Sequence, residues 1–175
     1  MMKLRMIFIL ILALISATCI QAQDVVNTIP CDDYEAITFK GKTIDQLNAT
    51  NAEPQVVQQL LGNYSSVDEL RENRSRAFNY GDNRIGFTYD VQTFVTRITI
   101  TNDQWPVVIQ GNTLKVGDTV ASLKQAFGND LIVAESQYRP RTFVAFGCSQ
   151  KDTGVDFEID PDTNTVTEIV YFVSP

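Results

Sequence analysis

The chain has 175 residues, a formal net charge of −7 and no histidine. Without histidine the sequence lacks the usual general base and the commonest zinc ligand. Its excess of acidic residues argues against nucleic acid or anionic lipid as a partner, and its length suits one domain or two small ones.

Residues 1–22 have the pattern of a secretion signal. Lys3 and Arg5 precede an apolar run of about a dozen residues, which is too short to span a bilayer stably. Ile20-Gln21-Ala22 fits a cleavage site before Gln23. Cleavage removes two basic residues and leaves 12 basic and 21 acidic ones, a formal charge of −9. We therefore predict a secreted or periplasmic protein that begins with an N-terminal tail, residues 23–34.

Cys19 offers an alternative to soluble export, because a cysteine after an apolar run can be the lipidated first residue of a bacterial lipoprotein. Ser16 and Thr18 match the lipoprotein signal poorly. Soluble export is therefore the favoured interpretation, and an envelope lipoprotein anchored through Cys19 stays open as the alternative.

Two cysteines, Cys31 and Cys148, remain after cleavage. An even pair in an oxidising compartment usually forms a disulfide. We predict a bridge that ties the N-terminal tail to the second half of the chain.

An internal repeat divides the rest of the chain into residues 35–104 and 105–175. Five blocks recur in the same order at offsets of 66 to 71 residues, which favours two tandem copies of one module. The paired blocks are 37–44 with 107–114, 56–63 with 122–129, 78–81 with 144–147, 85–90 with 155–160, and 95–100 with 166–171.

Each block has a predicted secondary structure. The second has apolar residues at helical spacing, with Pro54 in the first turn of one helix, Asp118 capping the other, and Gly62 and Gly128 ending them. The remaining blocks alternate apolar and polar residues as strands do. We predict an α+β fold: two tandem copies of a strand-helix-three-strand antiparallel unit, with the helix covering one face of each sheet.

The segment Gly111-Asn112-Thr113-Leu114-Lys115-Val116-Gly117-Asp118-Thr119, with Leu123 and Phe127-Gly128 after it, resembles the opening of exported modules with the β-lactamase inhibitor protein fold. The same helix-then-strands plan occurs in outer-membrane assembly lipoproteins of the SmpA/OmlA type and in repeat modules of bacterial secreted proteins. The resemblance covers about residues 35–175 as a pattern and implies a fold. The first copy departs from it, because residues 44–50 lack the Gly-Asp-Thr of the second.

The candidate catalytic and metal-binding residues have simpler interpretations. Cys148 as a nucleophile lacks a base and is expected to be bridged. Asp156, Glu158 and Asp160 fall on one strand face as an exposed acidic stripe rather than a glycosidase pair. Asp160, Asp162, Asn164 and Glu168 superficially match a calcium loop, but the glycine and glutamate at its key positions are missing. We predict no cofactor and no metal.

We therefore expect a non-enzymatic exported module that binds a protein through an outer strand face. A structural envelope component anchored through Cys19 is the alternative, and a carboxylate-based hydrolase is a third. Trp105, the only tryptophan, is interpreted as core between the copies, and the Arg139–Arg141 cluster as a solvated loop. The predicted binding face contains Thr88, Arg97 and Thr99 from the first copy, with Thr38 and Lys40 beside them, and Asp156, Glu158 and Glu168 from the second.

Overall fold

The computed structural model describes residues 27–70, 74–89, 92–136 and 140–173. The predicted signal, its cleavage site and Cys19 lie outside these residues. The helices are α2 (Cys31–Glu35), α3 (Ile44–Asn48), α4 (Pro54–Leu61) and α5 (Val120–Phe127). The strands are β1 (Asn27–Thr28), β2 (Thr38–Phe39), β3 (Lys42–Thr43), β4 (Ser66–Leu70), β5 (Ser75–Tyr80), β6 (Asn83–Thr88), β7 (Phe94–Ile100), β8 (Val107–Ile109), β9 (Asn112–Leu114), β10 (Ala134–Glu135), β11 (Thr142–Gly147), β12 (Thr153–Asp160) and β13 (Thr165–Val173).

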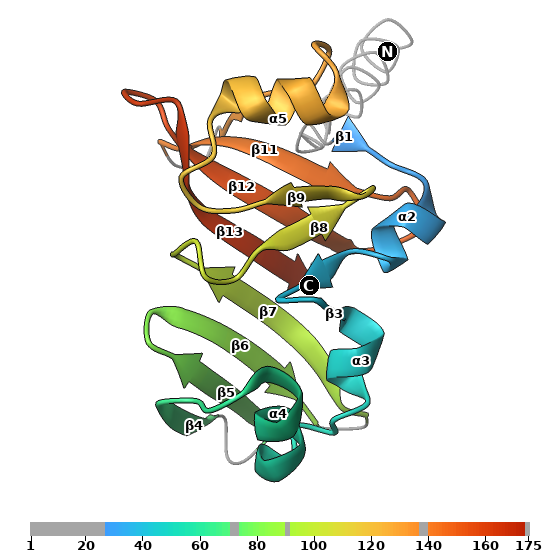
Figure 1. The fold of residues 1–175 in the computed structure, drawn as a ribbon. Helices are drawn as coiled ribbons and strands as arrows, with labels where there is room; N and C mark the ends of the chain where they lie inside the picture. Colours follow the sequence, from blue (N-terminus) through green and yellow to red (C-terminus); the bar gives the residue numbers. More distant parts are fainter. Residues whose placement is uncertain (1–26, 71–73, 90–91, 137–139, 174–175) are drawn as a thin grey trace, which may run out of the picture.

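The predicted α+β class is confirmed, and most strands belong to one large sheet (Figure 1). Within the described residues this sheet has nine strands in the order β1-β11-β12-β13-β7-β6-β5-β4, with β10 also paired to β11. Neighbouring strands are antiparallel except β1 and β11. The two sheets that we predicted, one in each copy, are thus joined into one, because β7 pairs with β13.

A small sheet, in the order β3-β2-β8-β9, consists of two hairpins. Lys40-Gly41 and Gln110-Gly111 form their turns, with φ of 52° and 73° in the first and 49° and 78° in the second. Two consecutive residues with positive φ produce the tight turn that suits strand twist. The single strand predicted before each helix is therefore a hairpin. After each helix there are four strands rather than the predicted three, because a short strand, β4 or β10, precedes them.

The predicted ends of α4 and α5 agree with the structure. Pro54 is in the first turn of α4, and Gly62 and Gly128 follow the two helices with φ of 88° and 105°. The cap of α5 was predicted one residue too early: Thr119 is the N-cap, in a reciprocal pair with Ser122, whereas the Asp118 carboxylate accepts the Lys115 backbone N–H. A similar cap pair starts α3, a helix that the sequence analysis did not predict.

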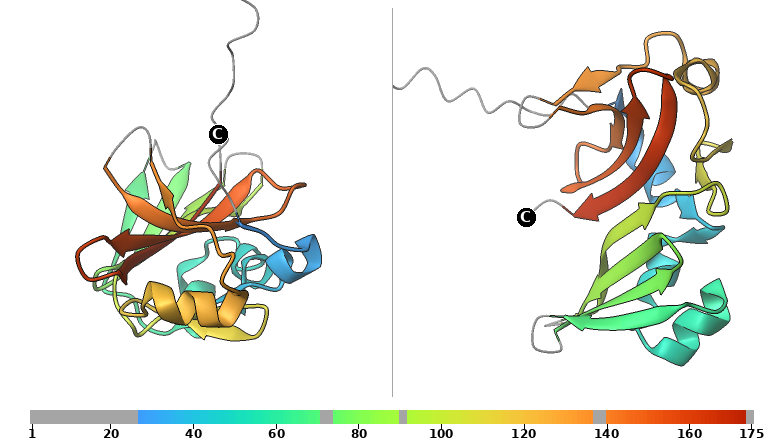
Figure 2. Two further views of the ribbon diagram at one scale, coloured as in Figure 1. Left: turned by 90° about the horizontal axis from the view of Figure 1, so that it is seen from above. Right: turned by 90° about the vertical axis from the view of Figure 1, so that its left-hand side faces the viewer.

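The core lies between the large sheet and a layer formed by the helices and the small sheet (Figure 2). Each half of the sheet carries an edge-to-face phenylalanine pair, Phe78–Phe87 and Phe146–Phe157, both with ring centres 5.8 Å apart. Trp105 is buried as core, as predicted, with its ring centre 4.9 Å from that of Tyr80. One face of the large sheet is therefore buried, and Figure 2 shows that none of the helices α2 to α5 covers the other.

The predicted disulfide between Cys31 and Cys148 is confirmed, with a Cα–Cα separation of 5.2 Å. It joins the start of α2 to the connection between β11 and β12. Such a bridge is compatible with an oxidising compartment. None of the helices in the described part of the chain is long and apolar enough to cross a membrane.

Candidate functional site

The candidate site is the uncovered face of the large sheet, which we call the open face. Side chains alternate between the two faces of a strand. Buried Ile85 and Phe87 on β6, and Ile98 and Ile100 on β7, therefore place the residues between them on the opposite side. We define the open face by Ala77, Arg84, Gly86, Thr88, Arg97, Thr99, Phe143, Asp156, Glu158, Glu168, Val170 and Phe172. Within this face Ala77, Phe143, Asp156 and Val170 are buried, whereas Arg84 and Arg97 are exposed.

Strand pairing makes the open face continuous across both halves of the chain. One row of neighbouring residues runs from Asp156 through Val170 and Thr99 to Arg84. The next row runs from Gly154 through Phe172 and Arg97 to Gly86 and Ala77. Residues far apart in the sequence thus form one surface.

The six residues of the predicted binding face lie on strands of this sheet: Thr88, Arg97 and Thr99 on β6 and β7, and Asp156, Glu158 and Glu168 on β12 and β13. Thr38 and Lys40 were wrongly placed beside them, because both belong to the small sheet. The Lys40 ammonium lies over the Tyr80 and Trp105 rings and donates to the Leu61 carbonyl. Burial lowers the pKa of Lys40, and this lysine has a packing role.

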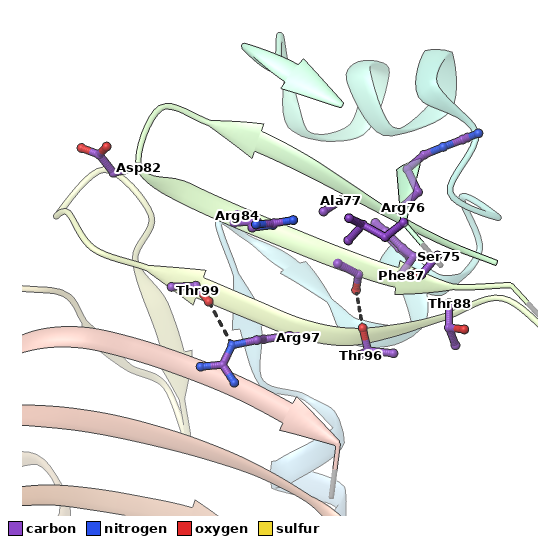
Figure 3. Close-up of a pocket in the computed structure, with 12 residues that line it drawn as sticks. Ser75, Arg76, Ala77, Asp82, Arg84, Phe87, Thr88, Thr96, Arg97 and Thr99 are labelled. Carbon is purple, nitrogen blue, oxygen red and sulfur yellow. Dashed lines mark hydrogen bonds between the residues drawn. The ribbon is translucent and has the colours of Figure 1, made fainter. Parts of the chain in front are cut away.

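A hollow of about 520 Å³ lies on the first half of the open face (Figure 3). Its floor is lined by small residues of β5 and β6, Ala77 and Gly86. Arg84 and Arg97 also line it, together with hydroxyl-bearing side chains: Ser75, Thr88, Thr96 and Thr99. Asp82 lies at the β5–β6 turn, apart from the other labelled side chains. The hollow therefore combines open space, guanidinium groups and hydroxyls.

Of the three arginines that line the hollow, Arg84 and Arg97 are exposed and Arg76 is half-buried, paired with Glu69. Arg84 lies 3.2 Å from the Asp68 carboxylate on the edge strand β4, in a pair whose side chains are both 44% exposed. Arg97 donates from Nε to the Thr99 hydroxyl at 3.3 Å. Among the described residues no carboxylate lies within ion-pair distance of Arg97. Its terminal nitrogens are thus available for a bidentate contact.

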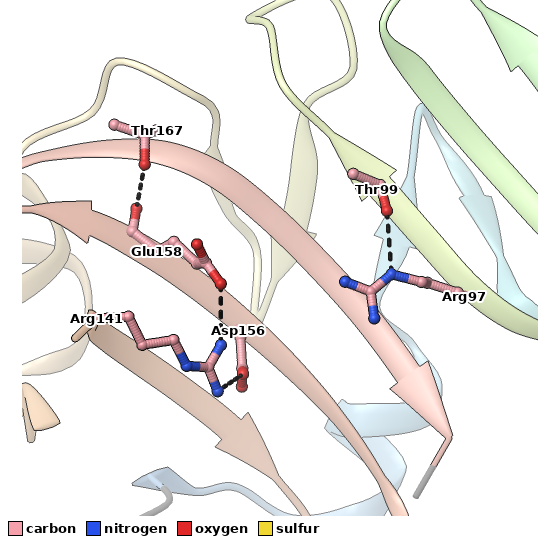
Figure 4. A network of polar contacts seen from close by, with 6 residues as sticks. All are labelled: Arg97, Thr99, Arg141, Asp156, Glu158 and Thr167. Carbon is pink, nitrogen blue, oxygen red and sulfur yellow. Dashed lines mark hydrogen bonds and ion pairs between the residues drawn. The ribbon is translucent and has the colours of Figure 1, made fainter. Parts of the chain in front are cut away.

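The second half of the open face holds an ion-pair network (Figure 4). Arg141 donates to Asp156 and Glu158, each at 3.0 Å, and its guanidinium carbon lies 4.4 Å from the centre of the Phe143 ring. The Asp156 side chain is 5% exposed and that of Arg141 is 18% exposed. Burial lowers the pKa of Arg141, but hydrogen bonds and charges from Glu158 and Asp156 raise it overall.

This network corrects two expectations. Asp156 and Glu158 do not form an exposed acidic stripe, because Arg141 pairs with both carboxylates. Arg141 is not a solvated loop residue, whereas Arg139 lies outside the described residues. Arg84 was not among the predicted site residues. Its position between the core residues Asn83 and Ile85 marks it as an outward residue of β6.

Three of the candidate calcium residues, Asp160, Asp162 and Asn164, lie at the turn between β12 and β13. The Asp160 carboxylate accepts the Asp162 backbone N–H and the Thr163 hydroxyl, both at 2.9 Å, and these bonds lower its pKa. Glu168 lies on β13 opposite Glu158. Among the described residues, no three His, Cys, Asp or Glu side chains are grouped in a way that could hold a metal ion. Cys148 is bridged, and so it is no free nucleophile.

No protein-family model and no curated protein sequence matches this chain. One similar solved structure is an extracellular protein containing a SCP domain from Bacillus anthracis str. Ames, with 11% identity and a TM-score of 0.41. The match covers 73% of this chain but only 45% of that protein. Another is a DUF4309 family protein from Bacillus subtilis subsp. subtilis str. 168, with 15% identity, a TM-score of 0.37, and coverage of 67% of this chain and 76% of that one.

Proposed function

We propose that this chain is an exported, non-enzymatic module that binds a protein partner through its open face. The observation that carries the proposal is the continuity of that face. Arginines of β6 and β7 and carboxylates of β12 lie on one surface that no helix in the described part of the chain covers. Because Arg141 pairs with both carboxylates, the available charge lies on the exposed arginines of the first half, and such a basic region favours a protein with a complementary acidic surface.

The module consists of two tandem copies, residues 35–104 and 105–175, arranged about an approximate two-fold axis. Two register pairs support this arrangement. Thr38 pairs with Val108, 70 residues later, and Thr99 pairs with Val170, 71 residues later. Equivalent residues that pair with each other are expected where a two-fold axis crosses an antiparallel strand pair.

The proposal of a non-enzymatic role is supported by how the carboxylates of the open face are used. Asp156 and Glu158 each bind Arg141, which makes them poor candidates for a general base. A broad hydrolase screen tests the third interpretation, since reproducible turnover that Asp156→Asn abolishes would contradict the binding role.

Export is supported by the disulfide and by the signal-like residues 1–22. Secretion, a periplasmic location and anchoring through Cys19 remain alternatives within this proposal. The intact mass of the mature protein separates anchoring through Cys19 from soluble export, because lipidation of Cys19 adds a large apolar increment and fixes the N-terminus there, whereas soluble export leaves Gln23 first.

Affinity capture from the native host tests the proposed function. The test variant is Arg84→Glu/Arg97→Glu on the open face. The matched control is Lys42→Glu/Lys115→Glu in and beside the small sheet, which we call the covered side because this layer packs on the other face of the large sheet. Both double variants change the net charge equally. We expect the first variant to bind the captured partner more weakly by about 1–3 kcal/mol and with altered salt dependence, and the control to bind as the parent does. Equal capture by all three proteins would overturn the proposal.

The expected change in folding stability is small for both variants, because their side chains are partly or fully exposed. Glu158, which the sequence placed on the same binding face, is less suitable for charge reversal. Its carboxylate holds Arg141, and so a loss of binding would be confounded by a loss of folding.

A further inference from the structure

The two halves of the open face carry opposite charges at corresponding positions. Each half has one β-bulge, between Gly86 and Phe87 in the first and between Glu158 and Ile159 in the second. The sequence repeat matched Gly86 with Asp156. Alignment on the bulges matches Gly86 with Glu158 instead, two residues later. Arg84 then corresponds to Asp156, and Arg97, the bulge-side partner of Gly86, corresponds to Glu168.

In the second half, the space beside the aligned residues Asp156 and Glu158 is already occupied by a charged group of the protein itself. The Arg141 guanidinium occupies it between Asp156 and Glu158, over the face of Phe143. Cross-strand pairing extends the correspondence, since Phe143 opposes Glu158 as Ala77 opposes Gly86. Arg141 lies two residues before Phe143, and Ser75 lies two residues before Ala77. The first half therefore lacks both the large ring and the long cation.

In the first half, the same position is the hollow. Gly86 and Ala77 leave its floor without a large side chain, and Arg84 and Arg97 line it. A Cβ added at Gly86 would lie 3.5 Å from the Thr96 hydroxyl, an ordinary contact, so the backbone leaves space for a side chain there. The second half suggests what belongs in such a space: a charged group held by residues of the opposite sign.

We propose that the hollow binds a carboxylate side chain from an acidic segment of the protein partner. This inference rests on the proposed function and names the chemistry that the open face recognises. The Arg84 and Arg97 guanidinium groups are suitable donors for a carboxylate, which Arg binds in a bidentate manner. The Thr99 hydroxyl accepts from Arg97 Nε and keeps its own proton to donate, whereas the Thr88 and Thr96 hydroxyls already donate to backbone carbonyls. The excess of acidic residues over the whole chain would repel a long polyanion, so a short acidic segment fits better than nucleic acid.

The structure suggests a variant that fills the hollow from within. Gly86→Glu copies Glu158 of the second half and places a carboxylate beside Arg97 and beside Arg84, which already pairs with Asp68. The new carboxylate therefore competes with the carboxylate of the partner, and both arginines stay in place. Arg97→Glu removes a binding group instead, and Lys115→Glu on the covered side is the charge-matched control.

The probe is a hexaglutamate peptide, titrated into the 15N-labelled mature protein at low salt, with hexalysine and inorganic phosphate as comparison ligands. We expect hexaglutamate to shift the amides of Gly86, Arg97 and Thr99 and the Arg97 Nε–H. Both Gly86→Glu and Arg97→Glu should weaken its binding at least tenfold, and Lys115→Glu should not. Circular dichroism and thermal melting show that each variant is folded.

Three results would overturn the inference: no shifts at these groups, equal weakening by Lys115→Glu, or phosphate binding as tight as hexaglutamate, which would indicate a general anion site. These failures are distinct from failure of the proposed function. If Arg84→Glu/Arg97→Glu abolishes partner capture but hexaglutamate does not bind, the open face is the interface and the carboxylate assignment is wrong. If hexaglutamate binds as expected but capture is unchanged, the interface lies elsewhere.

Discussion

The two halves of the open face use the same sheet positions for different purposes. In the second half, Arg141 neutralises Asp156 and Glu158 and lies against Phe143. These charged groups therefore stabilise the fold. In the first half, Arg84 and Arg97 line a hollow floored by Gly86 and Ala77. Charge at an outward strand position therefore does not identify a binding surface by itself, because burial and pairing decide whether the charge is available.

The disulfide is the largest single contribution to folding stability that differs between the two halves. Cys148 lies in the connection between β11 and β12, whereas the corresponding first-half connection is the turn at Gly81-Asp82. Closing a loop with a sequence separation of 117 residues corresponds to about 5 kcal/mol in the chain-entropy model, as an upper estimate. Cys31→Ser/Cys148→Ser should lower the free energy of unfolding by up to that amount in urea denaturation.

Peptide mapping without reduction provides the control for this prediction, since it should recover one linked pair that contains Cys31 and Cys148. Two thiols that react with an alkylating agent in the native oxidised protein would contradict the bridge.

Removal of one member of the ion-pair network should have the next largest effect. Asp156→Ala leaves the buried side of Arg141 with one carboxylate fewer, and we expect a loss of about 3 kcal/mol. The matched first-half change, Arg84→Ala, breaks a pair in which both side chains are 44% exposed and should cost less than about 1 kcal/mol. Equal losses of unfolding free energy in denaturant titrations would contradict the view that the charges stabilise the fold in the second half and are available for binding in the first.

Alkaline pH should destabilise the protein through a buried tyrosine near the second half. Burial raises the pKa of Tyr34, with partial compensation by the Thr153 hydroxyl, above its value of about 10 in the unfolded chain. The resulting stability is fully present below pH 10 and is lost as the pH rises, by up to about 1.4 kcal/mol per pH unit. Tyr34→Phe should flatten this slope between pH 9 and 11. An unchanged slope would show that other groups control it.

Gly86→Glu should change stability least, by no more than about 1 kcal/mol, although it introduces a charge on the sheet. The added Cβ has only ordinary contacts, and the new carboxylate lies near Arg97 and Arg84. Thermal melting measures the effect, with Gly154→Glu as a contrast in the second half. There an added Cβ would lie 2.8 Å from the Phe172 ring, so that variant should be clearly destabilised. Similar melting temperatures for both would contradict the difference in available space.

The sequence predicted the local features well because they depend on neighbouring residues. The glycines that end α4 and α5 follow apolar residues at helical spacing, and the alternating pattern identifies β6 and β12. The predicted cysteine pair followed from the signal and the even count. In each case a short pattern or a composition count was sufficient.

Non-local features could not be predicted in this way. Pairing of β7 with β13 depends on how two distant segments meet, and the single sheet followed from that contact. The bulges shift the correspondence of β6 and β12 by two residues, which no alignment of short blocks could detect. Arg141 was misinterpreted for the same reason, since only the register of β11 and β12 brings it beside Asp156 and Glu158.

Site-specific photo-crosslinking tests the central claim, that the open face is the binding surface, most directly. A photoreactive residue placed at Thr99, in the middle of the open face, should crosslink to the captured partner. The same residue at Lys115 on the covered side should not. Crosslinks from position 115, with none from position 99, would contradict the account and place the interface on the opposite side of the molecule.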